Sequence, residues 1–209
     1  MYTKEQFSIP PAAMAAFVRR KSFGVLATHL GDEMFTSPLP LDLRGQAPDG
    51  LFVAAHIARA NAMLAAFEHR PRATITVLGP DSFAPAEWFG TRSRIPTWLY
   101  CAVELSGRLE PSDPELTRQD LLVMMDRLQK RAVEGSTWTL DEIPDHLSGE
   151  YLKHIAGFRI NDLTMTSCFR LNQRKDHSES LADALAASSD PACRELAPLV
   201  AQPPTLQSA

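Results

Sequence analysis

Three absences limit the classes to which this 209-residue sequence can belong: few cysteines, no long apolar run and no excess of basic residues. The three cysteines, Cys101, Cys168 and Cys193, are far apart and form no CxxC pair. This pattern argues against a disulfide framework and predicts a reducing, cytoplasmic setting in which the thiols are buried or inert. A transmembrane helix requires roughly 18 consecutive apolar residues, and no segment reaches that length, so we expect no membrane contact. Residues 1–14 also lack the basic-then-apolar order of a secretory signal.

The charge balance is slightly acidic, with 21 lysines and arginines against 25 acidic residues and a formal net charge of −4. Such a protein has no general attraction to polyanions, so direct DNA binding is doubtful without a local basic patch. The densest basic cluster, at 19–21, is small and typical of a solvated helix end. With 44% apolar and 22% charged residues, the chain is long and apolar enough to bury a sizeable core.

Hydrophobic periodicity predicts short strands separated by turns and single helices. Turn signals lie at 31–33 and 45–50, and the proline-rich residues 79–98 are typical of a loop. Helices are predicted at 12–21, 58–70, 113–135, 143–155 and, with a break at Asp190-Pro191, 178–200. Strands are predicted at 22–29, 34–44, 51–56, 72–80, 99–111 and 156–173, the last with a bend at Asn161-Asp162.

Six or seven strands joined in this way favour a mainly β fold with some α: a small antiparallel barrel with peripheral helices and a C-terminal helical segment. Closure into a barrel is economical because it removes exposed strand edges. Pro38 and Pro40 cannot donate to a strand ladder, so their end of the second strand must be an edge or the lip of a cavity. The predicted organisation is one domain over 1–173, including a helical insert at 113–153, followed by a tail at 174–209.

The segment 54–61, AAHIARAN, passes directly from a short apolar strand into helix-forming sequence. Backbone N–H groups at the start of a helix lack intrahelical partners and favour anions. His56, Arg59 and Asn61 would add side-chain donors, so the turn is a candidate phosphate site. The alternative is structural: His56 could donate to a backbone carbonyl, and Arg59 could be a solvated residue of the first helical turn.

An ordered set of short pieces resembles the PaiB-like family, described as FMN-binding negative transcriptional regulators, within the split-barrel superfamily of pyridoxamine 5'-phosphate oxidase. No single piece is specific, but their order along the chain is. The pieces are SFGVLAT (22–28), PLPLDL (38–43), AHIARAN (55–61), VLGPDSFAPAEWF (77–89), IPTWLY (95–100), VELSGRLE (103–110), IAGFRI (155–160) and FRLNQ (169–173).

The sequence departs from the family pattern at three places. Residues 62–64 replace a proline and an aromatic residue after Asn61, and Leu99 replaces an asparagine after Trp98. The pair 172–173 stands where the pattern reads Ser-Gln-Asn. The change at Leu99 removes a polar group from the expected pocket region, which can alter or abolish flavin affinity.

The resemblance implies a six- to seven-stranded split barrel in which the turn after the third strand binds the FMN phosphate. It also implies a homodimer, with the flavin ring in a groove between the two subunits. By this resemblance, the side chains of His56, Arg59 and Asn61 would contact the phosphate and the ribityl chain. Backbone donors would come from Ile57 and Ala58. The candidates for the ring are Ser37, Pro38, Leu39 and Pro40 along its edge, and Trp98 as a stacking partner.

Other residues that could carry chemistry have a structural alternative. Trp88 is expected to anchor the proline-rich loop, whereas Trp98 is a candidate for either a structural role or stacking on a planar ring. Cys101 has no neighbouring base in the sequence and is expected in the core. His29 and His56 lack a third ligand at a recognisable spacing, so no metal site is expected.

The family resemblance implies a flavin-dependent negative regulator, acting on DNA directly or indirectly. The alternative is an FMN-dependent oxidoreductase, of the flavin reductase or small-molecule oxidase type, that exchanges electrons with a nicotinamide or another small substrate. No evident acid, base or nucleophile lies near the expected ring. A third possibility is a non-catalytic sensor or a heme-handling protein.

Overall fold

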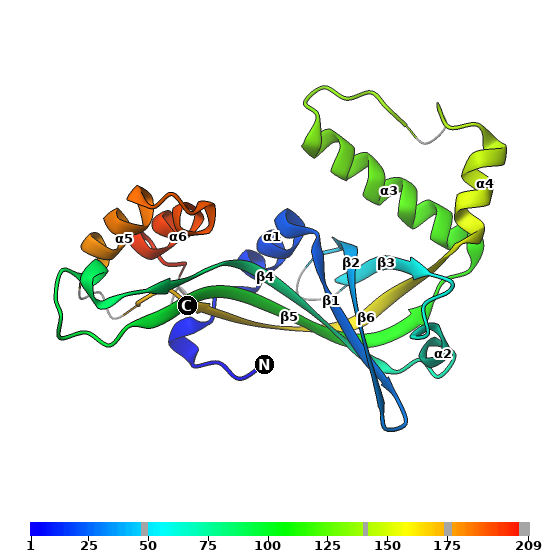
Figure 1. Ribbon diagram of the computed structural model, residues 1–209. Helices are drawn as coiled ribbons and strands as arrows, with labels where there is room; N and C mark the ends of the chain where they lie inside the picture. The colour runs from blue at the N-terminus through cyan, green and yellow to red at the C-terminus, as the bar shows by residue number, and fades with distance from the viewer. Residues whose placement is uncertain (47–49, 140–141, 174–176, 205–209) are drawn as a thin grey trace. The chain divides into compact units, whose positions relative to one another are not determined.

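The computed structural model describes residues 1–46, 50–139, 142–173 and 177–204 (Figure 1). The centre of the expected turn at 45–50 lies outside these ranges. The elements, in chain order, are η1 (Glu5–Phe7), α1 (Pro11–Lys21), β1 (Phe23–Leu30), β2 (Glu33–Arg44), β3 (Phe52–Ala58), α2 (Leu64–Phe67), β4 (Arg72–Ala84), η2 (Ala86–Phe89), β5 (Thr97–Pro111), α3 (Pro114–Ala132), α4 (Asp145–Lys153), β6 (Ile155–Arg170), α5 (Ser178–Ala187) and α6 (Pro191–Ala201).

The strands form a closed barrel in the order β1-β2-β3-β6-β5-β4. The pairs β1·β2, β2·β3 and β3·β6 are antiparallel. The hairpin of β1 and β2 is in register from Phe23 opposite Pro40 to Leu30 opposite Glu33 (Figure 1). The predicted mainly β barrel with helices is therefore confirmed, with six strands in the described part of the chain.

The chain divides into two compact units. One comprises Ser22–Ile75 and Leu105–Thr164, and is called the hairpin unit below; the other comprises Met1–Lys21, Thr76–Glu104 and Met165–Ala209, and is called the terminal unit. The expected boundary between a domain at 1–173 and a tail at 174–209 stays a prediction.

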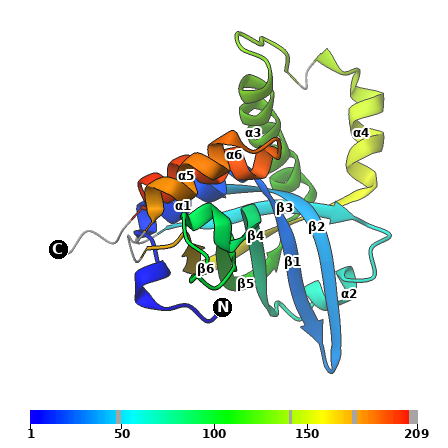
Figure 2. The ribbon, with the colours of Figure 1, turned by 60° about the vertical axis from the view of Figure 1, so that its left-hand side comes forward.

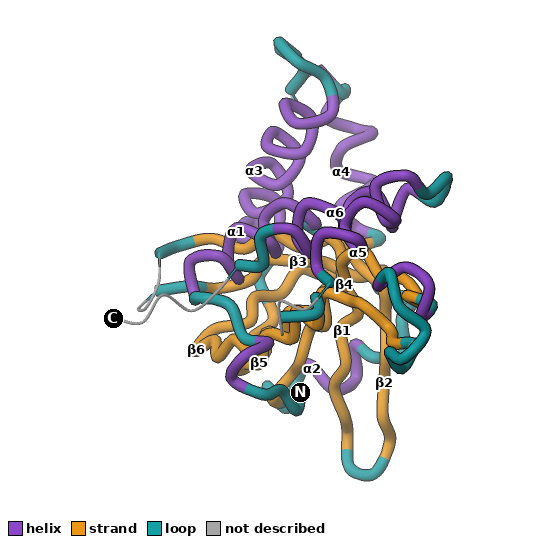
Figure 3. The backbone as a smooth tube through the Cα atoms, turned by 90° about the vertical axis from the view of Figure 1, so that its left-hand side faces the viewer, coloured by secondary structure: helices purple, strands orange, loops and turns teal. Residues whose placement is uncertain are grey.

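The core of the hairpin unit is built from alternating strand residues, as period-2 patterning requires. Leu26, Leu41 and Val53 are buried, and the rings of Phe67 and Phe158 meet edge to face at 5.0 Å. Helix α3 begins at the N-cap that the sequence predicts. The side chain of Asp113 accepts a hydrogen bond from the N–H of Leu116, and Pro114 is the first residue of the helix. Figure 3 shows α3 and α4 extending from the strands of this unit.

In the terminal unit, α1 packs through Phe17, whose ring meets that of Phe169 at 5.2 Å. Helices α5 and α6 lie side by side (Figure 2). Asp190 caps α6, with Pro191 in its first turn, so the predicted break at 190–191 is confirmed.

Two expectations were wrong in extent. The helix predicted at 58–70 is only the four residues of α2, because β3 continues to Ala58 and a turn occupies the residues between them. The loop predicted at 79–98 is shorter, since β4 continues to Ala84 and η2 follows it. The bend predicted in the last strand is confirmed: Asp162 has a φ of 52° within β6.

Candidate functional site

The turn after β3 brings the chain back to β2, and a side-chain hydrogen bond joins the turn to that strand. Asn61 Nδ2 donates to Ser37 Oγ at 3.3 Å. Asn61 Oδ1 accepts from the backbone N–H of Met63 at 3.0 Å, which fixes the orientation of the amide. The structure thus brings together two sets of residues that the sequence keeps about twenty positions apart.

On the side away from β1, residues 33–40 of β2 have no strand partner among the described residues, and this side is called the open edge below. β3 pairs only with Leu41–Arg44, whereas β1 pairs with residues 33–40 on the other side. The N–H of Leu41 donates to Ser22 O, so odd-numbered residues of β2 direct their backbone groups toward the β1 side. In an antiparallel strand the alternate residues then face the opposite edge. The carbonyls of Pro38 and Pro40 therefore point away from β1. The expectation that these prolines lie at an edge or at the lip of a cavity stays a prediction.

Arg59 leaves β3 at the start of the turn. Its backbone N–H donates to His154 O at 2.8 Å, and its Nε donates to Lys153 O at 3.0 Å. These two bonds hold the stem of the side chain against the end of α4. Within the described residues, the two terminal amino groups of Arg59 make no hydrogen bond, so they remain available to an anion.

His56 faces α3. It lines a small cavity with Ala54, Thr117, Asp120 and Met124. Burial lowers the pKa of His56 below its ordinary 6.5. At neutral pH the imidazole is uncharged, so His56 can offer a ligand a hydrogen bond but no positive charge.

The remaining predicted residues do not all reach this corner through their side chains. Leu39 and Ile57 are buried in the core, with 2% and 4% exposure, so their side chains do not reach a ligand. Ala58 is exposed at the end of β3. Trp98 belongs to the terminal unit, where its Nε1 donates to Asp81 Oδ1 at 2.9 Å.

Three backbone N–H groups of the turn before α2 already have partners within the turn, while the expected donors Ile57 and Ala58 stay a prediction. The N–H of Asn61 donates to Ala58 O, and the N–H groups of Met63 and Leu64 both donate to Asn61. These three N–H groups are therefore bonded within the turn before α2 and are not available to an anion. Side chains, rather than a helix terminus, supply the donors that remain.

A buried ion-pair network beside this corner was missed by the sequence reasoning. Asp120 of α3 binds Arg44 and Arg159, and Asp42 binds Arg44 and Arg127. Both aspartates are buried, at 7% and 2% exposure. The sequence signal that could have indicated this network is an aspartate at an otherwise apolar position of a strand or helix. The network connects α3 to β2 and β6, the two strands that flank β3 and His56.

Comparison with known proteins identifies one family by its model, one relative in sequence and several proteins with a similar fold. A family model described as "Putative FMN-binding domain" matches residues 1–161. "Protease synthase and sporulation protein PAI 2" of Bacillus subtilis (strain 168) is 24% identical over 203 residues, covering 96% of each chain.

Among solved structures, the FAD and heme binding protein from Mycobacterium smegmatis has a TM-score of 0.57 at 15% identity, covering 92% of this chain and 97% of that one. The flavocytochrome Anf3 from Azotobacter vinelandii has a TM-score of 0.55 at 15% identity, covering 78% of this chain and 69% of that one. These two likenesses show the fold. In the described ranges, no helix is both long and apolar enough to cross a membrane.

The residues around the β2 edge fit FMN in their donor chemistry. A phosphate requires a cation with hydrogen-bond donors, and the guanidinium of Arg59 with the neighbouring Asn61 and Ser37 provides such a set. The pyrimidine edge of a flavin carries both donors and acceptors, which suits a strand edge that presents proline carbonyls.

Proposed function

Because this chain belongs to the FMN-binding domain family matched over residues 1–161, we propose that it binds FMN at the corner between β3 and the open edge of β2, and acts as a PaiB-like negative regulator in the cytoplasm. The resemblance to the PaiB-like family is confirmed by the same match. The observation that carries the proposed site is the hydrogen bond from Asn61 to Ser37, because it joins the phosphate candidates to the ring candidates.

Each residue has a distinct role in this proposal. The terminal amino groups of Arg59 bind the phosphate, and its Nε bond to Lys153 O limits how far the side chain can move. His56 lines the small cavity beside α3, and burial disfavours its charged form, so this proposal assigns it no contact with the phosphate. Ser37 and the Pro38 carbonyl contact the edge of the ring. FMN itself supplies a redox-active ring, and the protein supplies its placement and surroundings.

A visible spectrum of the purified protein, with mass analysis of the small molecule released by heat, tests the cofactor. Arg59→Ala should weaken FMN binding by about 1–3 kcal/mol, the scale for a hydrogen bond to a charged group. Arg72→Ala is the matched control, since Arg72 is an exposed arginine of the same unit. Equal FMN affinity in wild type and Arg59→Ala would place the phosphate elsewhere.

The regulatory role is supported by the full-length similarity to the Bacillus subtilis sporulation protein. A gel-shift titration at low salt tests whether regulation is direct. With a net charge of −4 we expect no shift of DNA at micromolar protein, so that regulation proceeds through another macromolecule. Anaerobic bleaching of the flavin by NADH or NADPH would instead favour the oxidoreductase alternative.

A homodimer is the proposed assembly, supported by an exposed apolar face on the β1–β2 hairpin. Phe23, Val25 and Met34 are 55%, 39% and 67% exposed. Phe23 lies opposite Pro40 and Val25 opposite Pro38, so this face is continuous with the proposed FMN edge. Val25→Asp should shift the mass measured by light scattering from dimer to monomer. A wild-type protein that is monomeric at all concentrations would contradict the proposal.

A further inference from the structure

The C-terminal end of α4 is joined to the turn after β3 by two hydrogen bonds from one residue, Arg59. Its backbone N–H donates to His154 O at 2.8 Å, and its Nε donates to Lys153 O at 3.0 Å. Strand pairing continues from there, with Ala58 opposite Ile155. Figure 1 shows α4 leading directly into β6 beside the end of β3. The proposed phosphate ligand is therefore also the anchor of a helix.

The last turn of α4 lies at the surface. The side chains of Glu150, Tyr151, Lys153 and His154 are exposed, and Lys153 pairs with Glu150 inside the same turn. Among the described residues, the hydrogen bonds that join residues 150–154 to the turn after β3 are the two from Arg59. A helix end with exposed side chains and few external bonds opens at a low cost in free energy. Its stability therefore depends on Arg59.

The charge of Arg59 suits the end of a helix. The last carbonyls of a helix lack intrahelical partners and carry partial negative charge, so a cation stabilises them. Arg59 brings both a positive charge and an N–H donor to the carbonyl of Lys153, the last residue of α4. A residue from a different element thus caps this helix.

The guanidinium of Arg59 can hold the helix and a phosphate at the same time. The bond to Lys153 O uses Nε, whereas the terminal amino groups make no hydrogen bond within the described residues. A phosphate can accept parallel bonds from that end of the planar group. A side chain that one partner has already fixed loses less conformational entropy when it meets a second. The two contacts therefore favour one another.

We propose that FMN binding is transmitted to the helical insert through Arg59. The phosphate fixes the guanidinium, and the fixed guanidinium stabilises the end of α4. This inference rests on the proposed FMN site. Because such coupling is reciprocal, a partner macromolecule that opens the end of α4 lowers the affinity for FMN. In a regulator, α4 would thereby report whether the flavin site is occupied.

Amide hydrogen exchange of the full chain, followed by mass spectrometry, measures the opening of α4. Saturating FMN should slow exchange in the peptide that covers residues 149–154 by at least about fivefold, and should leave the peptides of α5 unchanged. Riboflavin has the same ring without the phosphate and is the matched ligand. At concentrations that saturate its own binding it should not slow exchange in α4. Equal slowing by riboflavin and FMN would overturn the proposal.

Arg59→Lys separates the affinity for FMN from the coupling. Lysine keeps the positive charge, but its ammonium is a point charge that lacks the planar set of donors. It can therefore bind the phosphate without also holding Lys153 O. With FMN raised to saturation, exchange in α4 should slow by less than about twofold in this variant. Equal slowing in wild type and Arg59→Lys would show that the coupling does not pass through Arg59.

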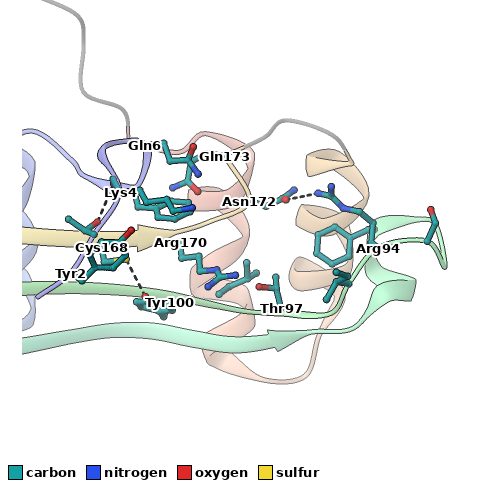
Figure 4. Close-up of a pocket in the computed structure, with 16 residues that line it drawn as sticks. Tyr2, Lys4, Gln6, Arg94, Thr97, Tyr100, Cys168, Arg170, Asn172 and Gln173 are labelled. Atoms are coloured by element: carbon teal, nitrogen blue, oxygen red, sulfur yellow. Dashed lines mark hydrogen bonds between the residues drawn. The ribbon is translucent and has the colours of Figure 1, made fainter.

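Arg170→Gln is the matched control. Arg170 is an exposed arginine that lines a cavity of about 560 Å³ in the terminal unit, together with Lys4 and Arg94 (Figure 4). This substitution should leave both the affinity for FMN and the slowing of exchange in α4 unchanged.

Failure of this proposal can be told from failure of the FMN site. If Arg59→Ala weakens FMN binding, but exchange in α4 is the same with and without FMN, the coupling fails and the FMN site stands. If Arg170→Gln, rather than Arg59→Ala, abolishes FMN binding, the cofactor lies in the cavity of the terminal unit and both proposals fail.

Discussion

Asp120 on α3 accepts a hydrogen bond from Arg44 on β2, with 2.7 Å between Asp120 Oδ1 and Arg44 Nη1. The same carboxylate also accepts two bonds from Arg159 on β6, each at 2.8 Å. One buried acidic group thus connects the helical insert to two strands. It keeps α3 in place over His56.

Asp120→Ala should lower the free energy of unfolding by about 3–5 kcal/mol, since it leaves the partly buried Arg159 without its carboxylate and leaves Arg44 with Asp42 alone. Urea unfolding followed by circular dichroism measures the change. Asp126→Ala is the control: its ion pair with Lys130 is exposed, so the loss should be no more than about 1 kcal/mol. Equal losses in both variants would contradict the structural role of Asp120.

Gly157→Ala should destabilise the protein by about 1–3 kcal/mol through overpacking. A Cβ at this position would lie 2.8 Å from Thr117 Cβ, and Thr117 cannot easily retreat because its hydroxyl donates to Asp113 O at 2.8 Å. The double variant Gly157→Ala/Thr117→Ala should recover part of the loss. Gly149→Ala, with open space around it, should be neutral or slightly stabilising. Strict additivity in the cycle would count against this contact.

His56 should make stability fall as pH decreases. Burial lowers its pKa in the folded state relative to the ordinary 6.5, so the unfolded chain binds more protons below about that pH. The folded state therefore loses stability as pH falls from 6.5 through the lowered pKa, and His56→Gln should reduce this slope. Urea midpoints at pH 7.5 and 5.5 measure it. His29→Gln, at an exposed position of β1, is the control, and an identical slope in wild type and His56→Gln would refute the prediction.

Cys101 should be unreactive. Burial raises its pKa to about 12, so at pH 8 only about one molecule in ten thousand carries the thiolate. All three cysteines are free and buried, and Ellman's reagent should therefore label none of them rapidly until urea is added. Cys101→Ser should leave the native labelling trace unchanged. A rapidly labelled thiol that disappears in this variant would show that the strand opens.

The local elements followed from the sequence because their causes are local. Alternating apolar residues predicted β1 and β2 nearly to the residue, and Asp113 with Pro114 predicted the start of α3. The helix predicted at 58–70 failed because periodicity cannot tell a four-residue helix within turns from a longer one. The side chain of Asn61 bonds to Met63 and Ser37 and holds these residues in a turn, so the helix begins only at Leu64.

Apart from Trp98, the candidate FMN residues were proposed from two contiguous stretches of the chain, 37–40 and 56–61. Their approach to one another was not predictable, since it depends on the register of β2 against β1 and on where β3 stops pairing. The buried aspartates were also missed, because an acidic residue in an apolar pattern does not reveal which arginine it will meet.

By itself, the sequence determined the strand and helix pattern, the apolar core and the family, because each depends on periodicity or on short ordered motifs. Only the tertiary structure decided which charged groups share a surface. Lys4, Arg94 and Arg170 come from three distant segments and line one cavity. The reason is physical: a charge acts over the distance in space, and strand pairing rather than sequence separation sets that distance.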